Sequence, residues 1–407
     1  MDSPVVQIIS PSGLTTYNVF DTIKVTAHVS DPDGLKTISV YIINGANIQV
    51  LPGYQITVTS DNMTFTVPYA LNNIHLASGN YNIVVDAYNG ANISYAYQKI
   101  YIAAAPEKRV AIYAITRAGN WLQGYSLDTL LHATPFFTVP GNFASSDINS
   151  YYQQLYLVPL DTGNMTALKV PSASTSWTLQ GINSPAQYFT NVYSYGNAAY
   201  VSLFSGFVRF YNNAGVLQLQ IATDTGYYPV KTFIWSNYLF VEEKALPPPN
   251  ENLVVFYQAT GMGYQQLALP NGPIVAMFGY DNNDLLVLGN ESTGQPYLLQ
   301  YNIPANTFFE PVSLPSSRLL SATQINSNTY LLAFANQTIY QYTWNPNSLG
   351  TYLNGLNASR LRYDPVHNEI IVSSGNAIKE YNYSTASLLY STSLADSVLD
   401  IQILYNE

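Results

Sequence analysis

The feature that most constrains the fold of this chain is a repeat of about 40 residues, which begins near residue 109 and continues to the end at residue 407. Each copy starts with an apolar strand and a turn rich in Asn, Asp and Ser. A second strand rich in Leu, Tyr and Val follows, and two further strands complete the copy. Repeats of this length with four short strands are typical of a β-propeller, in which each copy forms one blade.

Six copies are complete, and their second and third strands are the easiest parts to recognise. The second strands lie at residues 154–158, 199–203, 238–241, 285–288, 330–333 and 370–372. The third strands follow at residues 167–170, 208–211, 253–257, 298–301, 339–342 and 378–381.

The two ends of the repeat region supply a seventh unit. The chain closes with one apolar strand at residues 398–404, whereas the region opens with three strands, at 109–115, 121–127 and 136–139, that lack a first strand. We therefore predict that the last strand pairs with the strand that begins at Arg109. Closing the ring in this way removes the exposed sheet edges that promote aggregation.

The first 104 residues have a different pattern, with about seven short strands at regular spacing. The stretch from Ile23 to Val29 alternates apolar and polar residues, as a strand with one buried face does. It is followed by Asp31-Pro32-Asp33-Gly34, which is a strong turn signal. This number of strands in about 100 residues fits a β-sandwich.

Two stretches of this sandwich resemble a known family. The first stretch spans residues 25–45 and contains Ser-Asp-Pro-Asp-Gly at residues 30–34. The second stretch spans residues 76–87 and contains Gly79, Tyr81 and Ala87, which lie on the same side of a strand. Both are similar to the immunoglobulin-like (Ig-like) modules of secreted bacterial and archaeal proteins. The resemblance implies a spacer or adhesion unit.

The sixth copy of the repeat resembles the YncE-like and surface-layer YVTN β-propellers, which belong to a WD40-like superfamily. The similar segments are Asp364-Pro365 with Asn368 in the turn, and Ile378 to Thr385 in the following strand and turn. Other copies keep this pattern loosely, and the copy at Asn197 lacks Asp-Pro.

These patterns predict an all-β protein of two domains. We expect an Ig-like β-sandwich at residues 1–104 and a seven-bladed β-propeller at residues 105–407, closed by pairing of its N- and C-terminal strands. The segment 103–108, with three Ala, one Pro and two charged residues, separates them.

Charge limits the partners that this chain can have. Only 9% of residues are charged, the net charge is −10, and Lys and Arg number 14 without a basic cluster. This composition disfavours nucleic acid and anionic membrane surfaces as partners. A sparsely charged surface also suits acidic or salty surroundings, because few groups change charge there.

We expect a location outside the cytoplasm, from the composition, the glycosylation motifs given below and the family resemblances. No stretch of 18 apolar residues occurs, so we expect no membrane insertion by this chain, and we expect that a leader or anchor preceded Met1. The chain has no Cys, which excludes disulfides and thiolate metal sites. Seven Asn-x-Ser/Thr motifs are candidates for glycosylation. They are Asn62, Asn92, Asn164, Asn290, Asn336, Asn357 and Asn382.

The sequence contains few candidates for chemistry. Asp31, Asp33 and Asp86 would bind Ca²⁺ through oxygen ligands if they converged at one end of the sandwich, although Asp-Pro-Asp-Gly is also simply a good turn. No other cofactor is expected, and no catalytic motif is present. Glu242 and Glu243 are adjacent in a strand and therefore point to opposite faces, which disfavours joint acid–base catalysis.

Tyrosine is unusually common, with 36 copies. Most are expected to pack within strands, but aromatic rings also stack on sugars and are enriched at interfaces. Those at predicted strand ends and loops are candidates for a contact surface. They are Tyr151, Tyr152, Tyr193, Tyr195, Tyr227 and Tyr228.

The leading hypothesis from the sequence is a non-enzymatic extracellular or cell-surface binding or adhesion protein, whose propeller contacts proteins or glycans. One alternative is a carbohydrate-active hydrolase or lyase with a site in the propeller channel, which a funnel lined by acids, Arg and Tyr would favour. Another alternative is a structural subunit of a surface layer or filament.

Overall fold

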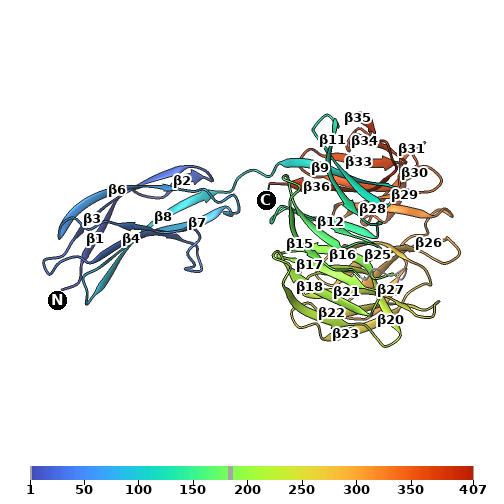
Figure 1. Ribbon diagram of the computed structural model, residues 1–407, viewed down its shortest axis with the longest axis horizontal. Helices are drawn as coiled ribbons and strands as arrows, with labels where there is room; N and C mark the ends of the chain where they lie inside the picture. Colours follow the sequence, from blue (N-terminus) through green and yellow to red (C-terminus); the bar gives the residue numbers. More distant parts are fainter. Residues whose placement is uncertain (1, 182–186, 407) are drawn as a thin grey trace. The chain divides into compact units, whose positions relative to one another are not determined.

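A computed structural model describes residues 2–181 and 187–406 of the chain, and no helix occurs among them. The chain forms two compact units that divide between Glu107 and Lys108, a few residues after the boundary expected from composition. In Figure 1 the first unit is coloured blue to cyan and the second runs from cyan through green to red.

The N-terminal unit is a sandwich of two sheets. Three strands form the first sheet, in the order β1 (Val5–Ser10), β3 (Thr22–Ser30) and β6 (Asn62–Ala70). Five strands form the second sheet, in the order β2 (Thr15–Asn18), β8 (Ile93–Ala103), β7 (Gly79–Tyr88), β4 (Thr37–Ile43) and β5 (Tyr54–Ile56). Neighbouring strands are antiparallel except β2 and β8, which are parallel.

Alternation in the sequence creates the core of this sandwich. Ile23, Val25, Ala27 and Val29 are all fully buried, and the residues between them face outward. Strand β2 was not predicted, because its sequence Thr-Thr-Tyr-Asn has no apolar alternation and its pairing with β8 depends on residues far along the chain. Strand β5 is short and ends at Ile56.

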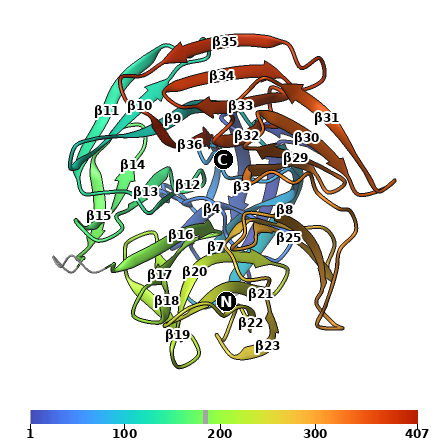
Figure 2. The same cartoon turned by 90° about the vertical axis from the view of Figure 1, so that its right-hand side faces the viewer.

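The second unit is a β-propeller of seven four-stranded antiparallel sheets, counted over the described residues (Figure 2). Blade 1 consists of β12 (Ser145–Asn149), β13 (Gln154–Val158), β14 (Met165–Lys169) and β15 (Thr175–Leu179). Blade 2 consists of β16 (Phe189–Tyr195), β17 (Ala198–Leu203), β18 (Phe207–Asn212) and β19 (Leu217–Ala222). Blade 3 consists of β20 (Tyr227–Trp235), β21 (Tyr238–Ala245), β22 (Glu251–Tyr257) and β23 (Gly263–Ala268).

Blades 4 to 6 have the same order from the centre outward. Blade 4 consists of β24 (Ile274–Gly279), β25 (Asp284–Asn290), β26 (Pro296–Asn302) and β27 (Thr307–Phe309). Blade 5 consists of β28 (Leu319–Asn326), β29 (Thr329–Phe334), β30 (Thr338–Thr343) and β31 (Ser348–Asn354). Blade 6 consists of β32 (Arg360–Asp364), β33 (Glu369–Ser374), β34 (Ala377–Asn382) and β35 (Leu388–Ser393).

Blade 7 joins the two ends of the propeller, as predicted. Its strand order is β11 (Ala133–Pro140), β10 (Trp121–Leu127), β9 (Arg109–Ala118) and β36 (Val398–Tyr405). Strand β36 pairs antiparallel with β9, from Val398 opposite Thr116 to Tyr405 opposite Arg109. The end of the chain therefore supplies the inner strand of a blade whose other strands begin the propeller (Figure 2).

Apolar side chains between blades hold the ring together. The described residues form seven apolar clusters in this unit, one for each pair of neighbouring blades. Second strands such as β13, β17 and β29 are buried along their whole length, because a neighbouring blade covers each of their two faces. Blade 7 contributes to two clusters, one shared with blade 6 and one shared with blade 1.

We expect ring closure to depend on the buried face of β36. Ile401→Ala should lower the free energy of unfolding of the propeller by about 2–5 kcal/mol, because Ile401 is fully buried between blades 6 and 7. Leu388→Ala is the matched control, because Leu388 is 53% exposed on β35, and its effect should stay within about 0.5 kcal/mol.

Urea denaturation followed by tryptophan fluorescence measures this difference. All four tryptophans, at 121, 177, 235 and 344, lie in the propeller, so the signal reports on that unit alone. Equal stabilities of the two variants would contradict the dependence of the ring on β36.

Candidate binding cavity in the propeller channel

A cavity of about 600 Å³ lies where the inner strands of the propeller meet. All seven inner strands contribute to its wall: β12, β16, β20, β24, β28, β32 and β36. The inner strands lie around the axis of the ring (Figure 2). Residues from all seven therefore line one space, although the strands are far apart in sequence.

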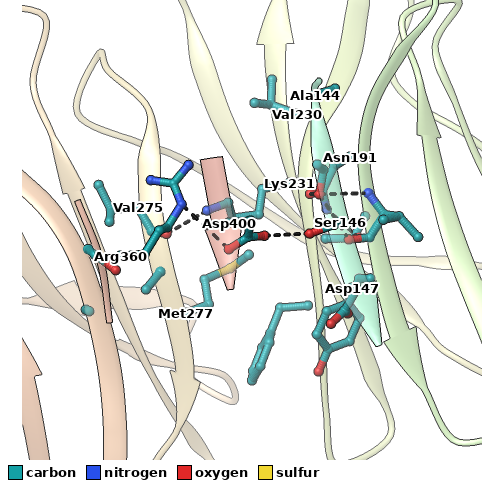
Figure 3. A pocket seen from close by; sticks show the side chains of 18 of the residues that line it. Ala144, Ser146, Asp147, Asn191, Val230, Lys231, Val275, Met277, Arg360 and Asp400 are labelled. Atoms are coloured by element: carbon teal, nitrogen blue, oxygen red, sulfur yellow. Dashed lines mark hydrogen bonds and ion pairs between the residues drawn. The ribbon is translucent and has the colours of Figure 1, made fainter. Parts of the chain in front are cut away.

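Asp400 is the centre of the polar contacts in this cavity. Its Oδ1 lies 3.1 Å from Arg362 Nη2 and 3.6 Å from Arg360 Nε. Its Oδ2 accepts hydrogen bonds from Ser146 Oγ at 2.8 Å and from Gln402 Nε2 at 3.1 Å. The contacts from Arg360 through Asp400 to Ser146 cross the cavity and link three blades (Figure 3).

Asp147 is the second acid of the wall, and the backbone satisfies it. Its Oδ2 accepts the N–H of Ser194 at 2.6 Å, and its Oδ1 accepts the N–H of Ile148 at 2.9 Å. Burial raises the pKa of Asp147 to about 6, although these two hydrogen bonds act in the opposite direction. Both oxygens of each channel acid therefore already have partners within the protein.

Lys231 projects from β20 into the cavity (Figure 3). Its Nζ donates to the carbonyl oxygen of Val275 at 2.6 Å, which uses one of its three protons. Burial lowers the pKa of Lys231, and the charge of Glu242, its cross-strand neighbour on β21, opposes this shift. Glu242 Oε1 accepts the N–H of Ile274 at 2.9 Å, and burial raises the pKa of Glu242 to about 7.

Apolar side chains form much of the remaining wall. Val192, Val230, Val275 and Met277 line the cavity, and Met277 is buried. Tyr193 lies there as well, with its ring centroid 5.6 Å from that of Phe233. The cavity thus combines a small number of charged groups with apolar and aromatic walls, which is typical of ligand-binding sites.

A second polar cluster lies where blades 6 and 7 join. Nη1 of Arg109 contacts Asp364 Oδ2 at 2.9 Å, Glu369 Oε2 at 2.9 Å and Glu380 Oε1 at 2.6 Å. The side chains of Arg109, Asp364 and Glu380 are almost completely buried, and Tyr405 of β36 donates to Asp364 Oδ1 at 3.2 Å. These contacts tie the closing blade to its neighbour.

Part of this cluster has the spacing of a metal site. Ligand atoms of Asp364, His367 and Glu369 lie within 4.8 Å of one another. However, Arg109 Nη1 lies within 2.9 Å of both carboxylates, so the guanidinium already occupies the position between them. We therefore interpret the cluster as a buried ion-pair network that stabilises the closed ring.

The predicted calcium ligands do not converge. Asp31 Oδ1 accepts the N–H of Asp33 at 2.8 Å, and Asp31 Oδ2 accepts Asn89 Nδ2 at 2.8 Å, so this buried carboxylate closes a turn. Asp86 lies on β7 opposite Ser39, and its oxygen atoms do not form a group within 4.8 Å with those of the other two. For Asp31 the alternative interpretation of Asp-Pro-Asp-Gly as a turn describes the contacts, because its carboxylate accepts a backbone N–H of that turn.

The predicted tyrosines lie in several places. Tyr193 lines the cavity, whereas Tyr195 is 42% exposed at the end of β16, beside the turn at residues 196–197. Tyr151 and Tyr152 lie in the turn before β13, with ring centroids 4.8 Å apart. The two turns adjoin, because Asn149 Nδ2 donates to the carbonyl oxygen of Gly196 at 2.9 Å.

The remaining pair of tyrosines lies at the other end of the blades. Tyr227 and Tyr228 begin β20 and are half-buried, and the ring of Tyr228 lies 4.5 Å from that of Phe204. The six tyrosines therefore do not make one contact surface.

One glycosylation candidate is not available in the folded chain. Asn290 is 3% exposed, donates to the carbonyl oxygen of Leu319 at 2.9 Å and accepts the N–H of Leu319 at 2.7 Å. Its amide thus connects blades 4 and 5 and has no room for a glycan. Asn62, Asn164, Asn336 and Asn357 are exposed, and Asn92 and Asn382 are half-buried.

Sequence reasoning missed the charged residues of the cavity: Lys231, Arg360, Arg362, Asp147 and Asp400. A signal was present, because three of only 14 basic residues fall in first strands of the repeat, which line the channel of a propeller.

Glu242 and Glu243 point to opposite faces of their strand, as expected. Glu242 accepts a hydrogen bond from the backbone N–H of Ile274 in blade 4, and Glu243 accepts one from the backbone N–H of Asp224 on the side of blade 2.

Comparisons with known proteins identify both folds. A family model described as a bacterial Ig domain matches residues 4–85, which confirms the predicted Ig-like unit. No curated protein matches the chain. No helix among the described residues is long and apolar enough to cross a membrane.

Solved structures resemble the propeller. The WD40 β-propeller domain of Doa1 has 11% identity and a TM-score of 0.51, and the match covers 65% of this chain and 86% of that domain. A chain of a mitotic checkpoint complex has 13% identity, a TM-score of 0.53, and coverage of 64% and 81%. A hydrazine synthase chain of Kuenenia stuttgartiensis has 10% identity, a TM-score of 0.52, and coverage of 70% and 95%. At these identities the likeness concerns the fold alone.

The buried acids predict that the propeller is more stable at pH 5 than at pH 7.5. Burial raises the pKa of Glu243 from 4.5 to about 7, and its Oε2 accepts the N–H of Asp224 at 3.2 Å. Between these two pH values the folded state binds a proton that the unfolded state releases, so the free energy of unfolding falls as pH rises.

Urea denaturation at several pH values tests this sign. Glu243→Gln should reduce the loss of stability between pH 5 and pH 7.5, because the group that titrates is removed. Glu310→Gln, at an exposed position, should keep the wild-type dependence. A stability that rises over this interval in the wild type would show that burial of the acids is not the dominant effect.

Proposed function

We propose that this chain is a non-enzymatic binding protein of the cell surface or extracellular space, which holds a small ligand in the propeller channel. The observation that carries the proposal is the cavity of about 600 Å³ between the inner strands, with few charged groups and apolar walls. Its volume lies within the range of about 300–1,000 Å³ usual for small-molecule sites.

The contacts of the channel acids favour binding over hydrolysis. A general acid or base must reach the substrate through a free carboxyl oxygen. Both oxygens of Asp400 contact Arg or polar side chains, and both oxygens of Asp147 accept backbone N–H groups. The preference for binding rests on Asp400, whose oxygens hold several side chains and the backbone, because each oxygen of Asp147 keeps a second lone pair.

Two observations favour the enzyme alternative. The first is the lining of the cavity by two acids, two arginines and a tyrosine (Asp147, Asp400, Arg360, Arg362 and Tyr193), which is the lining that an enzyme channel was expected to have. The second concerns proton affinity. Burial raises the pKa of Asp147 to about 6, so this acid can exchange a proton near neutral pH, and burial also lowers the pKa of Lys231 in the same wall. A hydrolase or lyase acting on carbohydrate in the channel is therefore the second candidate. Release of reducing sugar from an acidic polysaccharide, abolished by Asp147→Asn, would favour it over binding.

The location outside the cytoplasm is part of the proposal. It is supported by the match of residues 4–85 to bacterial Ig domains and by the low content of charged residues. The Ig-like unit would serve as a spacer or adhesion unit, and the partners would be surface glycans or proteins. A role as a subunit of a surface layer remains the third candidate, since the sixth blade resembles propellers of such layers.

Filling the cavity tests the proposed site. Ala276 lines the channel on β24, and Ala276→Phe should abolish binding of the ligand because the new ring occupies its space. The wild type and the variant would be compared on an array of surface glycans and, by thermal shift, against a panel of small organic acids and sugars.

Ala305→Phe is the matched control, because Ala305 lies exposed in the turn between β26 and β27. It should bind as the wild type does. Binding that survives Ala276→Phe would place the ligand elsewhere, and the absence of any ligand would contradict the proposed function.

A further inference from the structure

We propose that the channel ligand carries a carboxylate, which binds at Arg360 and Lys231 beside Asp400. This inference rests on the proposed function, since it assigns the chemistry of the ligand in the same cavity. The two cations lie on β32 and β20, which reach the cavity from different blades (Figure 3).

The balance of charge in the cavity points to an anion. Three basic side chains, Lys231, Arg360 and Arg362, and two acids, Asp147 and Asp400, line the wall. If all five are charged, the wall carries one positive charge in excess. Glu242, the cross-strand neighbour of Lys231, offsets this excess when it is ionised, and burial raises its pKa to about 7, so the excess is present below neutral pH. This excess contrasts with the net charge of −10 of the whole chain, which contains only 14 basic residues.

The balance of hydrogen bonds points the same way. The acids have internal partners on all four oxygens. Arg360 donates from Nη1 to the carbonyl oxygen of Ser359 and pairs with Asp400 through Nε at 3.6 Å. A guanidinium has five N–H groups, so these two contacts do not use all of its donors. Lys231 Nζ uses one of three protons on Val275. Both cations therefore keep donors that an anion can use, while Asp147 keeps a second lone pair on each oxygen.

A carboxylate fits these donors better than a more highly charged anion. The two acids of the wall repel negative charge, and a single added charge is enough to balance the excess. Planar carboxylates match the fork of an arginine side chain, and the apolar walls at Val192, Val230 and Met277 suit an uncharged remainder of the ligand.

The groups around the cations make binding depend on pH. Lys231 is influenced by Glu242, Arg360, Arg362 and Asp400, and Glu242 in turn by Lys244 and Glu251. Burial raises the pKa of Asp147 to about 6 and that of Glu242 to about 7, so both lose negative charge as pH falls from 8 to 5. The cavity then attracts an anion more strongly.

Calorimetry with defined probes tests the assignment on the full chain. The probes are glucuronate with glucose as its neutral analogue, and N-acetyl-alanyl-alanine with its C-terminal amide. We expect a carboxylate probe to bind and its neutral analogue to bind at least about tenfold more weakly, the range expected for a charge-assisted hydrogen bond. Binding of glucuronate alone identifies an acidic sugar, and binding of the peptide alone identifies a peptide C-terminus.

Variants link binding to the named residues. Arg360→Gln should weaken binding of the carboxylate about tenfold. Arg318→Gln is the control, since Arg318 is exposed and outside the cavity, and it should bind as the wild type does. Lys231→Met is the second variant and should also weaken binding of the carboxylate, because it removes the positive charge of the ammonium. It also removes the positive neighbour of buried Glu242, so circular dichroism would verify that each variant is folded.

The pH dependence provides an independent readout. Affinity for the carboxylate probe should rise about tenfold from pH 8 to pH 5, the factor that corresponds to a change of one pKa unit on binding. Affinity that is unchanged or lower at pH 5, neutral analogues that bind equally well, or a folded Arg360→Gln variant with wild-type affinity would overturn the inference.

The two proposals can fail separately. If a neutral ligand from the array binds and Ala276→Phe blocks it while the carboxylate probes do not bind, the channel site stands and its anion specificity is wrong. If neither the array nor the probes give binding that Ala276→Phe blocks, the proposed function and this inference both fail.

Discussion

The pairing of β36 with β9 is the contact on which the rest of the propeller depends. It joins segments almost 300 residues apart and completes blade 7, which supplies apolar side chains to the cores on both of its sides. Without it, two of the seven clusters between blades would lose a wall, and a ring with an open edge would expose strands to association. The ion pairs of Arg109 with Asp364 and Glu380 add a polar link at the same joint.

Closure of the ring also creates the candidate site. Asp400 and Gln402 belong to β36, and their partners Arg360 and Ser146 belong to blades 6 and 1. The strand that completes the fold therefore carries the residue around which the cavity is organised. Stability and binding are coupled here by geometry, because the inner strand of the closing blade must be in register for the channel contacts to form.

The chain has few charged residues but buries several of them. Arg109, Glu242, Glu243 and Glu380 lie inside the propeller, and burial raises the pKa of each of these three glutamates to about 7. Charge inside a protein is costly unless it is paired or hydrogen-bonded, and acids with raised pKa values avoid part of this cost by binding a proton.

The sequence by itself determined the two domains, the seven blades and the closing strand, because apolar runs and turn residues recur locally and a lone strand at one end matches a missing strand at the other. It also indicated that Glu242 and Glu243 face opposite ways, since alternation is a property of one strand. Only the tertiary structure decided that Lys231, Arg360 and Asp400 line the same cavity, and that Asp86 lies apart from Asp31. The spatial proximity of these side chains depends on the register of strands from separate blades or sheets, which no local pattern encodes.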